Sequence, residues 1–343
     1  MTRKPNAVKG NGNGFARPLG LAKPIGAAGF AASALSTEGL RVASQVRNAH
    51  LAIAKRTDPD TKELEKRTKH LESFVDGKLK EYATSHPTFF WWSRITGCYL
   101  EIMGKILGII EEFGKWYPAG DVMIPPGIKY PQPVDDGSGN LWVFVRGIER
   151  LTKPSALRKF AGLTPESKRE AGELLEFNLE LRTILFRLGQ FGFMFRKNRY
   201  YEQYLLYKGW KLAELGRLGV KVMPTPKGRY CAKCVQEKTV PKTTFFCPDC
   251  NTKLSPKKEQ EGVLFEGHLD MMCRRWMVQR FLDHLWAIWR EAEGLPVTNP
   301  YVQGILGHVD IIDPWQMCDK DVGSLERVSD ADVTTEESKT VTV

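Results

Sequence analysis

Two Cys-x-x-Cys knuckles constrain this chain of 343 residues more than any other feature of its sequence. Cys231 and Cys234 form the first knuckle, Cys247 and Cys250 form the second, and twelve residues separate the two. A tight turn places cysteines three positions apart on the same side of the backbone, so four thiolates can converge on one tetrahedral ion. Asn251, which follows the second knuckle, favours such turns. The spacing therefore predicts a structural zinc ion.

The segment around the knuckles is predicted to be a small β zinc ribbon, inserted at residues 224–262. Residues 239–246 are rich in threonine, valine and phenylalanine, which are typical of strands. A redox dithiol pair and disulfide bonds are alternatives, but two knuckles at ribbon spacing fit them less well. A catalytic zinc is disfavoured because four thiolates fill the coordination shell and leave no position for water. We interpret the ribbon as a structural clip first, which also presents lysines to a partner: Lys233, Lys238 and Lys242.

The remaining cysteines and the hydropathy pattern indicate the cellular compartment and whether a membrane is involved. Cys98, Cys273 and Cys318 stand alone in the sequence and are expected to be unpaired thiols. We expect no signal peptide, and this cysteine usage favours a reducing compartment. No apolar run reaches the length of a membrane span, so we expect no membrane partner.

The net charge of +10 is unevenly distributed. From Cys318 to Val343 there are three basic and seven acidic residues, whereas the rest of the chain carries 47 basic and 33 acidic residues. A basic body indicates a polyanionic partner, and nucleic acid is the usual one. The alternative is that lysine and arginine only keep the surface soluble.

The N-terminal region is predicted to be an arm followed by a helical pair. Residues 1–37 are rich in glycine, alanine, proline and asparagine and carry no acidic residue, so we expect a disordered basic arm rather than a transit peptide. Residues 38–84 predict a helical pair or coiled coil, in which Asp58 caps the second helix and Pro59 lies in its first turn. The apolar residues of that helix form a narrow stripe, which favours a coiled-coil seam or hairpin and a homodimer: Leu64, Leu71, Val75, Leu79 and Tyr82.

The body of the chain is predicted to be mainly α-helical, in two segments at residues 85–223 and 263–303, with the zinc ribbon between them. Residues 118–140 are expected to form a loop, and residues 304–343 an acidic flexible tail. In the segment before the ribbon, a long helix follows a Gly-Leu-Thr-Pro turn and has a single apolar side: Leu174, Leu175, Leu181, Ile184, Leu185 and Leu188. In the segment after the ribbon, a helix carries a core stripe: Val278, Phe281, Leu282, Leu285 and Ile288.

The turn Ile95-Thr96-Gly97 has the outline of a helix-hairpin-helix. In that motif a glycine turn offers backbone N–H groups to a phosphate. The usual second glycine would fall at Tyr99, so we expect an imperfect nest. The alternative is an ordinary buried helix after a turn.

The order "SRITG…GKILGIIEEF", "LTKPSALRKFAGLTP" and "GHLDMMCRRWMVQRFLDHLWAIWREAEGLP" resembles the C-terminal half of the Piv/MooV-type insertion-sequence transposases. It resembles most the phage and archaeal relatives of that family that lack the RuvC-like N-terminal domain. The match covers about residues 85–190 and 266–303, and residues 160–165, Phe-Ala-Gly-Leu-Thr-Pro, are its most specific piece. The resemblance implies a DNA-binding helical domain from a prokaryotic or phage-encoded, nucleoid-associated protein of the cytoplasm.

Two features that the family uses for DNA transposition and recombination are missing from the sequence. The full-length enzymes place four acidic residues on a RuvC-like domain, and we expect no such domain here, because a flexible arm and a helical pair stand in its place. They also use a serine nucleophile in a Ser-Gly pair after the Gly-Leu-x-Pro turn. Gly172 matches the glycine, but Ala171 stands where the serine belongs, and alanine cannot attack a phosphodiester. We therefore assign no catalytic residue.

Three functions follow as hypotheses. The first is a nucleic-acid-binding protein, DNA or structured RNA, derived from such a transposase and without autonomous catalysis. The second is a recombinase subunit that receives a nuclease domain from another chain and uses Ser155 or Ser167 as nucleophile. The third is a zinc-ribbon scaffold for protein partners. For each candidate contact, the alternative is an ordinary solvated residue with no role in binding. The candidate nucleic-acid contacts are Arg94, Gly97, Lys105, Arg182, Arg187, Arg274 and Arg275.

Overall fold

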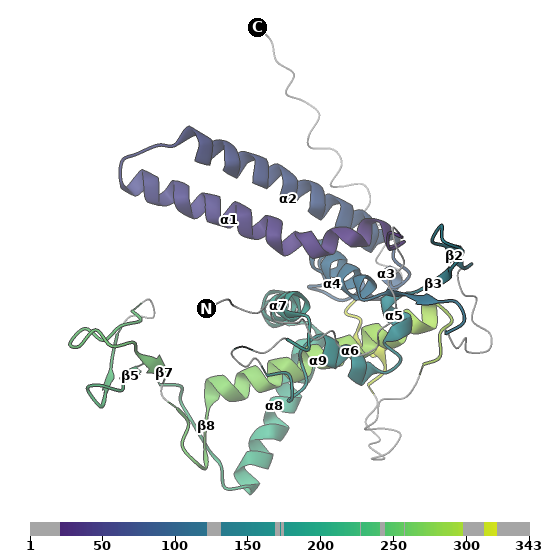
Figure 1. Cartoon of the computed structure of the whole chain (residues 1–343). Coiled ribbons are helices and arrows are strands. Elements are labelled where there is room, and N and C mark those ends of the chain that lie inside the picture. The colour runs from purple at the N-terminus through teal and green to yellow at the C-terminus, as the bar shows by residue number, and fades with distance from the viewer. Residues whose placement is uncertain are drawn as a thin grey trace, which may run out of the picture. The chain divides into compact units, whose positions relative to one another are not determined.

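A computed structural model describes residues 21–121, 132–168, 172, 175–226, 228–240, 244–256, 258–297 and 312–320. Most of these residues are helical, as the sequence predicted, and the sheets are small (Figure 1). The chain divides into two compact units. Unit 1 comprises residues 1–94, 98–185 and 282–316, and unit 2 comprises residues 95–97, 186–281 and 317–343. No helix in the described ranges has the length and apolar character that a membrane crossing requires.

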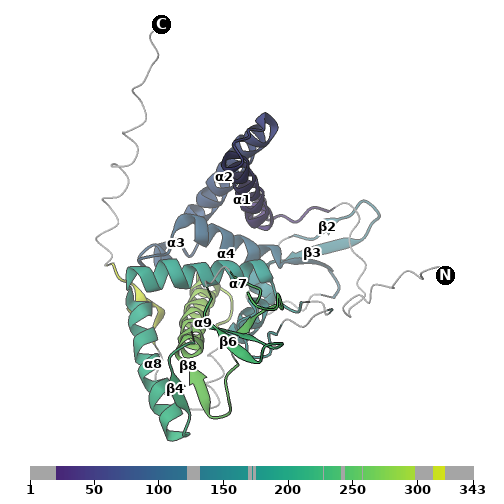
Figure 2. The same cartoon turned by 90° about the vertical axis from the view of Figure 1, so that its left-hand side faces the viewer.

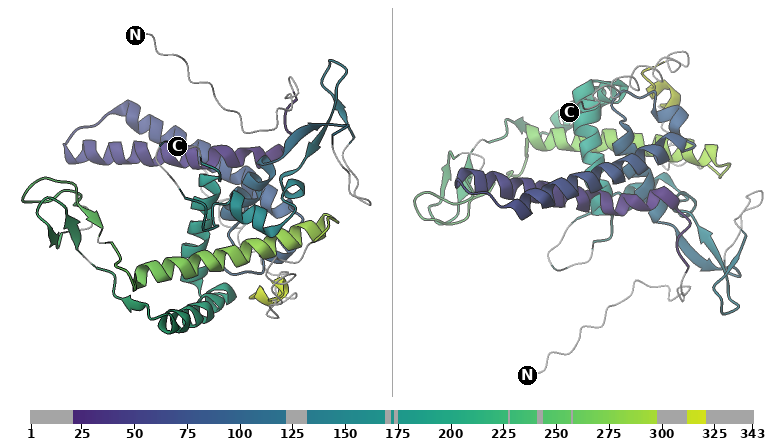
Figure 3. Two further views of the ribbon diagram at one scale, coloured as in Figure 1. Left: turned by 60° about the horizontal axis from the view of Figure 1, so that its bottom comes forward. Right: turned by 90° about the horizontal axis from the view of Figure 1, so that it is seen from above.

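Unit 1 begins with a short 3-10 helix, η1 (Gly26–Phe30), and an antiparallel hairpin of α1 (Ala31–Ile53) and α2 (Pro59–Ser85), seen in Figures 1 and 3. The predicted cap of α2 is confirmed, because the Asp58 carboxylate accepts from the Asp60 amide at 3.2 Å. The predicted arm is too long, since α1 begins at Ala31 rather than near residue 38. The first residue of α1 packs against α4 (Leu100–Glu112). Ala31 and Gly108 are in such close contact that a Cβ added to Gly108 would lie 2.6 Å from the Ala31 Cβ. Residues 1–20 lie outside the described part of the chain.

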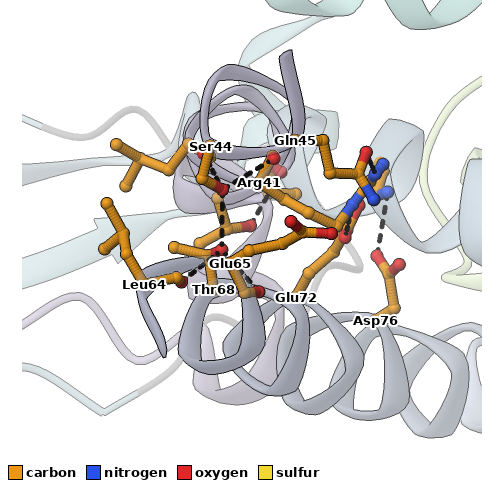
Figure 4. Close-up of polar contacts among 12 residues, drawn as sticks. Arg41, Ser44, Gln45, Leu64, Glu65, Thr68, Glu72 and Asp76 are labelled. Carbon is orange, nitrogen blue, oxygen red and sulfur yellow. Dashed lines mark hydrogen bonds and ion pairs between the residues drawn. The ribbon is translucent and has the colours of Figure 1, made fainter. Parts of the chain in front are cut away.

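The seam of the hairpin is made of small polar residues rather than leucines. Ser44 and Thr68 are buried and lie opposite each other with their hydroxyl oxygens 3.5 Å apart (Figure 4). Each hydroxyl also donates to a carbonyl of its own helix. The stripe predicted for α2 is therefore only half correct: Val75 and Leu79 are buried, whereas Leu64 and Leu71 are about half exposed.

The rest of unit 1 packs short helices around an antiparallel sheet. After α3 (Phe89–Trp92) and α4 come β1 (Lys115–Pro118), β2 (Val134–Asp135) and β3 (Leu141–Val145), with β3 in the centre of the sheet. The sheet corrects the prediction of a plain loop at 118–140, of which residues 122–131 lie outside the described ranges. The sequence Leu-Trp-Val-Phe-Val forms β3 because aromatic and β-branched residues favour a half-buried strand. The helices α5 (Gly147–Arg150), α6 (Pro154–Phe160) and α7 (Leu179–Arg187) follow.

Charged residues in the interior of unit 1 are paired. Arg146 contacts Glu111 and lies 2.8 Å from Glu293, and Arg158 pairs with Asp283. These pairs tie the α4 and α6 regions to the C-terminal end of α9 (Glu266–Ala292), whose residues from Leu282 onward belong to unit 1. Burial and pairing together explain why these charges are tolerated, since an unpaired charge in the interior is costly.

Unit 2 contains a π-helical segment, η2 (Leu188–Met194), then α8 (Arg199–Arg217) and the N-terminal portion of α9. Figure 2 shows α8 leading into β4 (Lys221–Met223), which pairs in parallel with β8 (Val263–Phe265) directly before α9. The stripe predicted for the helix after the ribbon is confirmed, because its residues are buried: Val278, Phe281, Leu282, Leu285 and Ile288. The long helix predicted before the ribbon begins only at Leu179, as α7. On its predicted apolar side, Leu175 is exposed and Leu174 lies outside the described residues, whereas the others are buried as expected: Leu181, Ile184, Leu185 and Leu188.

The tail predicted to be flexible is structured at residues 312–320. Pro314–Met317 form a 3-10 helix, η3, and the Trp91 indole donates to the Pro314 carbonyl at 2.9 Å in unit 1. Met317 is buried in unit 2. An apolar anchor and satisfied hydrogen bonds hold this stretch in place despite its acidic composition. The other residues predicted for the tail, 304–311 and 321–343, lie outside the described ranges.

Candidate metal centre

The four cysteines lie in unit 2, in a ribbon that Figures 1 and 3 show at the far end of two connecting segments. Its sheet has β5 (Arg229–Cys231) in the centre, with β6 (Gln236–Lys238) and β7 (Ser255–Pro256) on either side, both antiparallel. Cys231 ends β5 and faces Gln236, so the first knuckle is the turn between two paired strands. The strands predicted at 239–246 are not seen among the described residues, where only an isolated bridge joins Phe246 to Lys253.

The second knuckle is also closed by backbone hydrogen bonds. The Cys247 amide donates to the Thr252 carbonyl at 2.8 Å, and the Asn251 amide donates to the Cys247 carbonyl at 2.9 Å. The residue after each knuckle has a left-handed backbone: Val235 and Asn251 both have a φ of 54°. Asparagine adopts this conformation readily, as the sequence predicted, whereas a β-branched valine does so under strain. The residues that follow the two knuckles therefore share the same φ despite their different side chains.

The distances between the sulfurs fit a tetrahedral metal ion. The Sγ atoms of Cys231 and Cys250 are 3.4 Å apart, those of Cys234 and Cys250 3.4 Å, and those of Cys234 and Cys247 3.8 Å. A zinc ion with sulfur ligands at about 2.3 Å implies sulfur–sulfur separations of about 3.8 Å. A disulfide requires about 2.05 Å, which excludes bonded pairs in this arrangement. All four ligand atoms lie within 4.8 Å of one another, so the residues fit the predicted ion.

The surroundings of the sulfurs favour thiolates at one corner of the cluster. Cys231 and Cys247 are buried with Leu254. The Thr252 hydroxyl, 3.4 Å from the Cys250 Sγ, lowers the pKa of that thiol to about 6, because a hydrogen bond to the charged form stabilises it. Without an ion, the neighbouring thiols raise the pKa of Cys234 to about 12, and the hydrogen bond to Cys250 is the largest cause of this shift. A bound cation removes this conflict, since it stabilises every thiolate that coordinates it.

Chemically, the arrangement is a closed site. Four thiolates complete a tetrahedral shell, so the cluster can hold a structural ion but offers no position at which a substrate or water would bind. Across the described residues, these four cysteines form the only group of three or more histidines, cysteines and acidic residues placed to share a metal. His268 lies apart from this cluster and pairs with Glu259 at 2.7 Å.

The outer surface of the ribbon carries aromatic and basic side chains. Phe245 and Phe246 are 55% and 54% exposed, and the Arg229 guanidinium lies 4.8 Å from the centre of the Phe245 ring. Lys233 is exposed, whereas Lys238 pairs with Asp249 at 2.6 Å. Lys242 lies outside the described residues. The contact of Arg229 with Phe245 was not predicted from the sequence, although two adjacent phenylalanines beside the second knuckle were a visible signal.

Three of the candidate nucleic-acid contacts lie in unit 1, and each is engaged within the chain. Lys105 is mostly buried and pairs with Asp76 at 2.8 Å. Arg94 lies over the Trp315 ring at 5.5 Å. The Arg182 guanidinium lies 5.1 Å from the centre of a phenylalanine ring and donates to a backbone carbonyl. Among the described residues, no contact joins these three side chains to one another, so they do not form a shared basic patch.

The other four candidates lie in unit 2. Gly97 is buried in its turn, and Arg274 is held by Asp270 at 2.6 Å and by Gln190. Arg187 is half-buried and Arg275 is exposed. Of the seven candidates, Arg275 therefore has the side chain most accessible to a polyanion.

The alternative nucleophiles lie in different surroundings. Ser155 is exposed in the first turn of α6, and the Ser167 hydroxyl lies 2.9 Å from that of Thr164. Gly172 has a left-handed backbone with φ of 88°, whereas Ala171 lies outside the described residues.

Comparisons with known proteins add no relative. No protein-family model matches this chain, and no curated protein or solved structure is similar to it. The resemblance to transposases therefore stays a prediction that rests on the sequence motifs.

Proposed function

We propose that this protein binds nucleic acid without catalysing a reaction, that it derives from an insertion-sequence transposase, and that its zinc ribbon supplies a contact surface. The observation that carries the proposal is the pair of exposed rings, Phe245 and Phe246, on the ribbon with the four clustered cysteines, where the Arg229 guanidinium lies over the Phe245 ring. Exposed aromatic rings stack on bases with little sequence preference, and arginine strengthens such contacts. A metal-clipped sheet keeps these side chains in place before binding, which lowers the entropic cost of association.

The charge of the ribbon supports the same proposal. Residues 224–262 contain eight basic and four acidic residues. Even after four thiolates and one divalent ion are counted, the segment keeps a positive charge that favours phosphates. Lys105 and Arg274 are weaker candidates than the sequence suggested. Each is in an ion pair, with which a phosphate would have to compete.

The test measures binding of labelled single-stranded DNA, duplex DNA and structured RNA over a salt series. We expect affinity to fall steeply with salt, and Phe245→Ala and Phe246→Ala each to weaken single-strand binding about 5- to 100-fold, as the loss of one stacked base implies. Leu206→Ala, which removes an exposed apolar side chain of α8, is the matched control and leaves affinity unchanged. If none of the three nucleic acids binds at low salt, the proposal is wrong and a protein-interaction scaffold becomes the better hypothesis.

We further propose that two copies pair through the helices of residues 38–84. Val46 and Ile53 of α1, and Leu64 and Leu71 of α2, are exposed apolar residues in pairs one heptad apart. Heptad spacing is what a coiled-coil contact with another helix requires. Light scattering after size exclusion tests the proposal: the unaltered protein has the mass of a dimer, and Leu64→Glu with Leu71→Glu reduces it to a monomer. A monomer before substitution refutes it.

A further inference from the structure

In unit 2, the turn at Thr96 and the start of α8 hold one carboxylate between them. The Thr96 amide donates to one oxygen of Asp319 at 2.7 Å, and the Arg199 amide donates to the other oxygen at 2.9 Å. The Asn198 side chain joins the two donors, because its amide group donates to the Thr96 carbonyl at 2.7 Å. Two backbone N–H groups more than 100 residues apart in sequence therefore converge on one anion.

The two donors are fixed by contacts that do not involve Asp319. Gly97 has a φ of 96°, and a Cβ on it would lie 2.5 Å from the Gly192 carbonyl oxygen, so the turn sits directly on the π-helical segment η2. Asn198 caps α8 by accepting from the Tyr201 amide at 3.1 Å. The nineteen-residue helix α8 adds the partial positive charge of its N-terminus. The anion site is therefore built into the fold, and the carboxylate is its present occupant.

Three exposed basic residues lie next to this site, together with one acidic residue, Glu202, in the first turn of α8. Arg196, Lys197 and Arg199 are exposed around the start of α8, and the Arg196 guanidinium lies 5.7 Å from the ring centre of Phe195, which is 74% exposed. Two converging N–H donors with cations beside them are also the arrangement that binds phosphate oxygens at helix N-termini.

We propose that the amides of Thr96 and Arg199 form a phosphate-binding site for the nucleic-acid backbone, and that Asp319 occupies it in the protein alone as an internal competitor. The Asp319 oxygens stand in for two phosphate oxygens, and nucleic acid gains this contact only when Asp319 withdraws. The inference rests on the proposed function for the identity of its ligand. Its consequence is autoinhibition, because the apparent affinity is reduced by the fraction of molecules in which Asp319 occupies the site.

The first experiment compares the nucleic-acid affinities of the full chain and of Asp319→Ala. We expect Asp319→Ala to bind about tenfold more tightly at low salt, and Asp319→Asn, which keeps the shape but removes the charge, to lie between the two. Asp313→Asn is the matched control. Asp313 belongs to the same segment, but its carboxylate accepts from the Trp315 amide at 2.9 Å and not from Thr96 or Arg199, so we expect this variant to keep the affinity of the unaltered protein. Equal affinities for all four proteins overturn the autoinhibition.

The second experiment needs no nucleic acid. In Asp319→Ala the site is open, so we expect inorganic phosphate to raise the thermal midpoint of this variant but not that of the unaltered protein. Adding Arg199→Pro should abolish the effect, because proline removes the donor and is favourable at the first position of a helix. Asn198 already has the extended backbone that a following proline demands, with φ of −77° and ψ of −176°. Arg199→Gln, which loses the charge but keeps the amide, retains most of the effect.

The two experiments separate this inference from the proposed function. If nucleic acid binds, but Asp319→Ala neither tightens binding nor responds to phosphate, the site is refuted and the proposed function stands. If no nucleic acid binds, but phosphate stabilises Asp319→Ala and Arg199→Pro abolishes this, the phosphate site stands and the proposed function fails.

Discussion

His86 makes the stability of unit 1 depend on acid in a way that can be calculated. The ring is 4% exposed and lies edge-on to Trp289, with ring centres 4.4 Å apart. Its Nδ1 accepts from the Thr88 amide at 3.2 Å and lies 2.8 Å from the Thr88 hydroxyl. Burial lowers the pKa of His86 to about 3, and the positive charge of Arg146 contributes to the same shift. The imidazole is therefore neutral in the folded protein across the usual pH range.

The sign and size of the effect follow from the two pKa values. In the unfolded chain a histidine has its ordinary pKa of about 6.5, so between pH 6.5 and 3 the unfolded state binds a proton that the folded state does not. Stability is therefore lost as the pH falls below about 6.5, with a slope of about 1.4 kcal/mol per pH unit from this one group. Between pH 7 and 4.5 the loss amounts to about 2–3 kcal/mol.

Neighbouring carboxyl groups contribute with the opposite sign. Burial raises the pKa values of Glu111 and Glu149, although Arg146 opposes both shifts. A carboxyl group whose pKa is raised by folding favours the folded state at low pH, and this contribution is lost as the pH rises through the raised value. The total pH dependence therefore mixes opposing terms, and only a comparison between variants isolates His86.

The assay is urea unfolding, followed by tryptophan fluorescence, at several pH values between 7 and 4.5. We expect His86→Gln to be less stable at pH 7 because it loses the contact with Trp289, but to lose about 2–3 kcal/mol less than the unaltered protein as the pH falls. His70→Gln, at an exposed position of α2, should reproduce the pH dependence of the unaltered protein. Parallel curves for His86→Gln and the unaltered protein would refute the reasoning.

Three further predictions concern the ribbon and the turn of unit 2. A chelator or Cys250→Ser should release about one zinc per chain and unfold the ribbon while most helical circular dichroism remains; a reduced protein without zinc in mass spectrometry contradicts this. Val235→Gly should raise stability by about 1 kcal/mol in thermal unfolding, because the exposed valine has a φ of 54°; a loss of stability contradicts it. Gly97→Ala should cost about 3 kcal/mol, since its Cβ would lie 2.5 Å from the Gly192 carbonyl oxygen, and an unchanged midpoint contradicts it.

The features that the sequence predicted well are those whose determinants lie within one or two turns of the chain. The Asp58 cap, the knuckles with the turn at Asn251, and the buried stripe of α9 are all confirmed. Each depends on residue spacing, which backbone geometry converts directly into position. The left-handed backbone of Val235 was not predicted, because valine carries no turn preference.

The features that the sequence did not predict depend on tertiary contacts between side chains of different helices. The leucines of α2 suggested an apolar seam, yet Ser44 and Thr68 are buried there, whereas Leu64 and Leu71 are about half exposed. Lys105 and Arg274 were candidate polyanion contacts, but each pairs with an aspartate. Asp270 lies four residues before Arg274 on α9, so this pair could have been read from helix spacing. Asp76, in contrast, meets Lys105 from another helix, which only the tertiary fold brings close. A charged residue looks the same in sequence whether it faces solvent or a partner on the next helix.

The turn at Thr96 combines a feature that the sequence predicted with one that only the tertiary fold determines. Its glycine and the following helix marked it in the sequence as a place where amides meet an anion, and its amide does bind a carboxylate. The occupant was unpredictable, because Asp319 lies 223 residues from Thr96 and 120 residues from Arg199, in a segment whose composition predicted flexibility. Backbone donors carry no side-chain signature, so only the fold brings the second amide to the same carboxylate. If phosphate competes for these donors as we propose, the acidic C-terminal segment and the basic surface beside α8 belong to one binding equilibrium, and neither the affinity of the protein nor its salt dependence can be assigned to the basic residues alone.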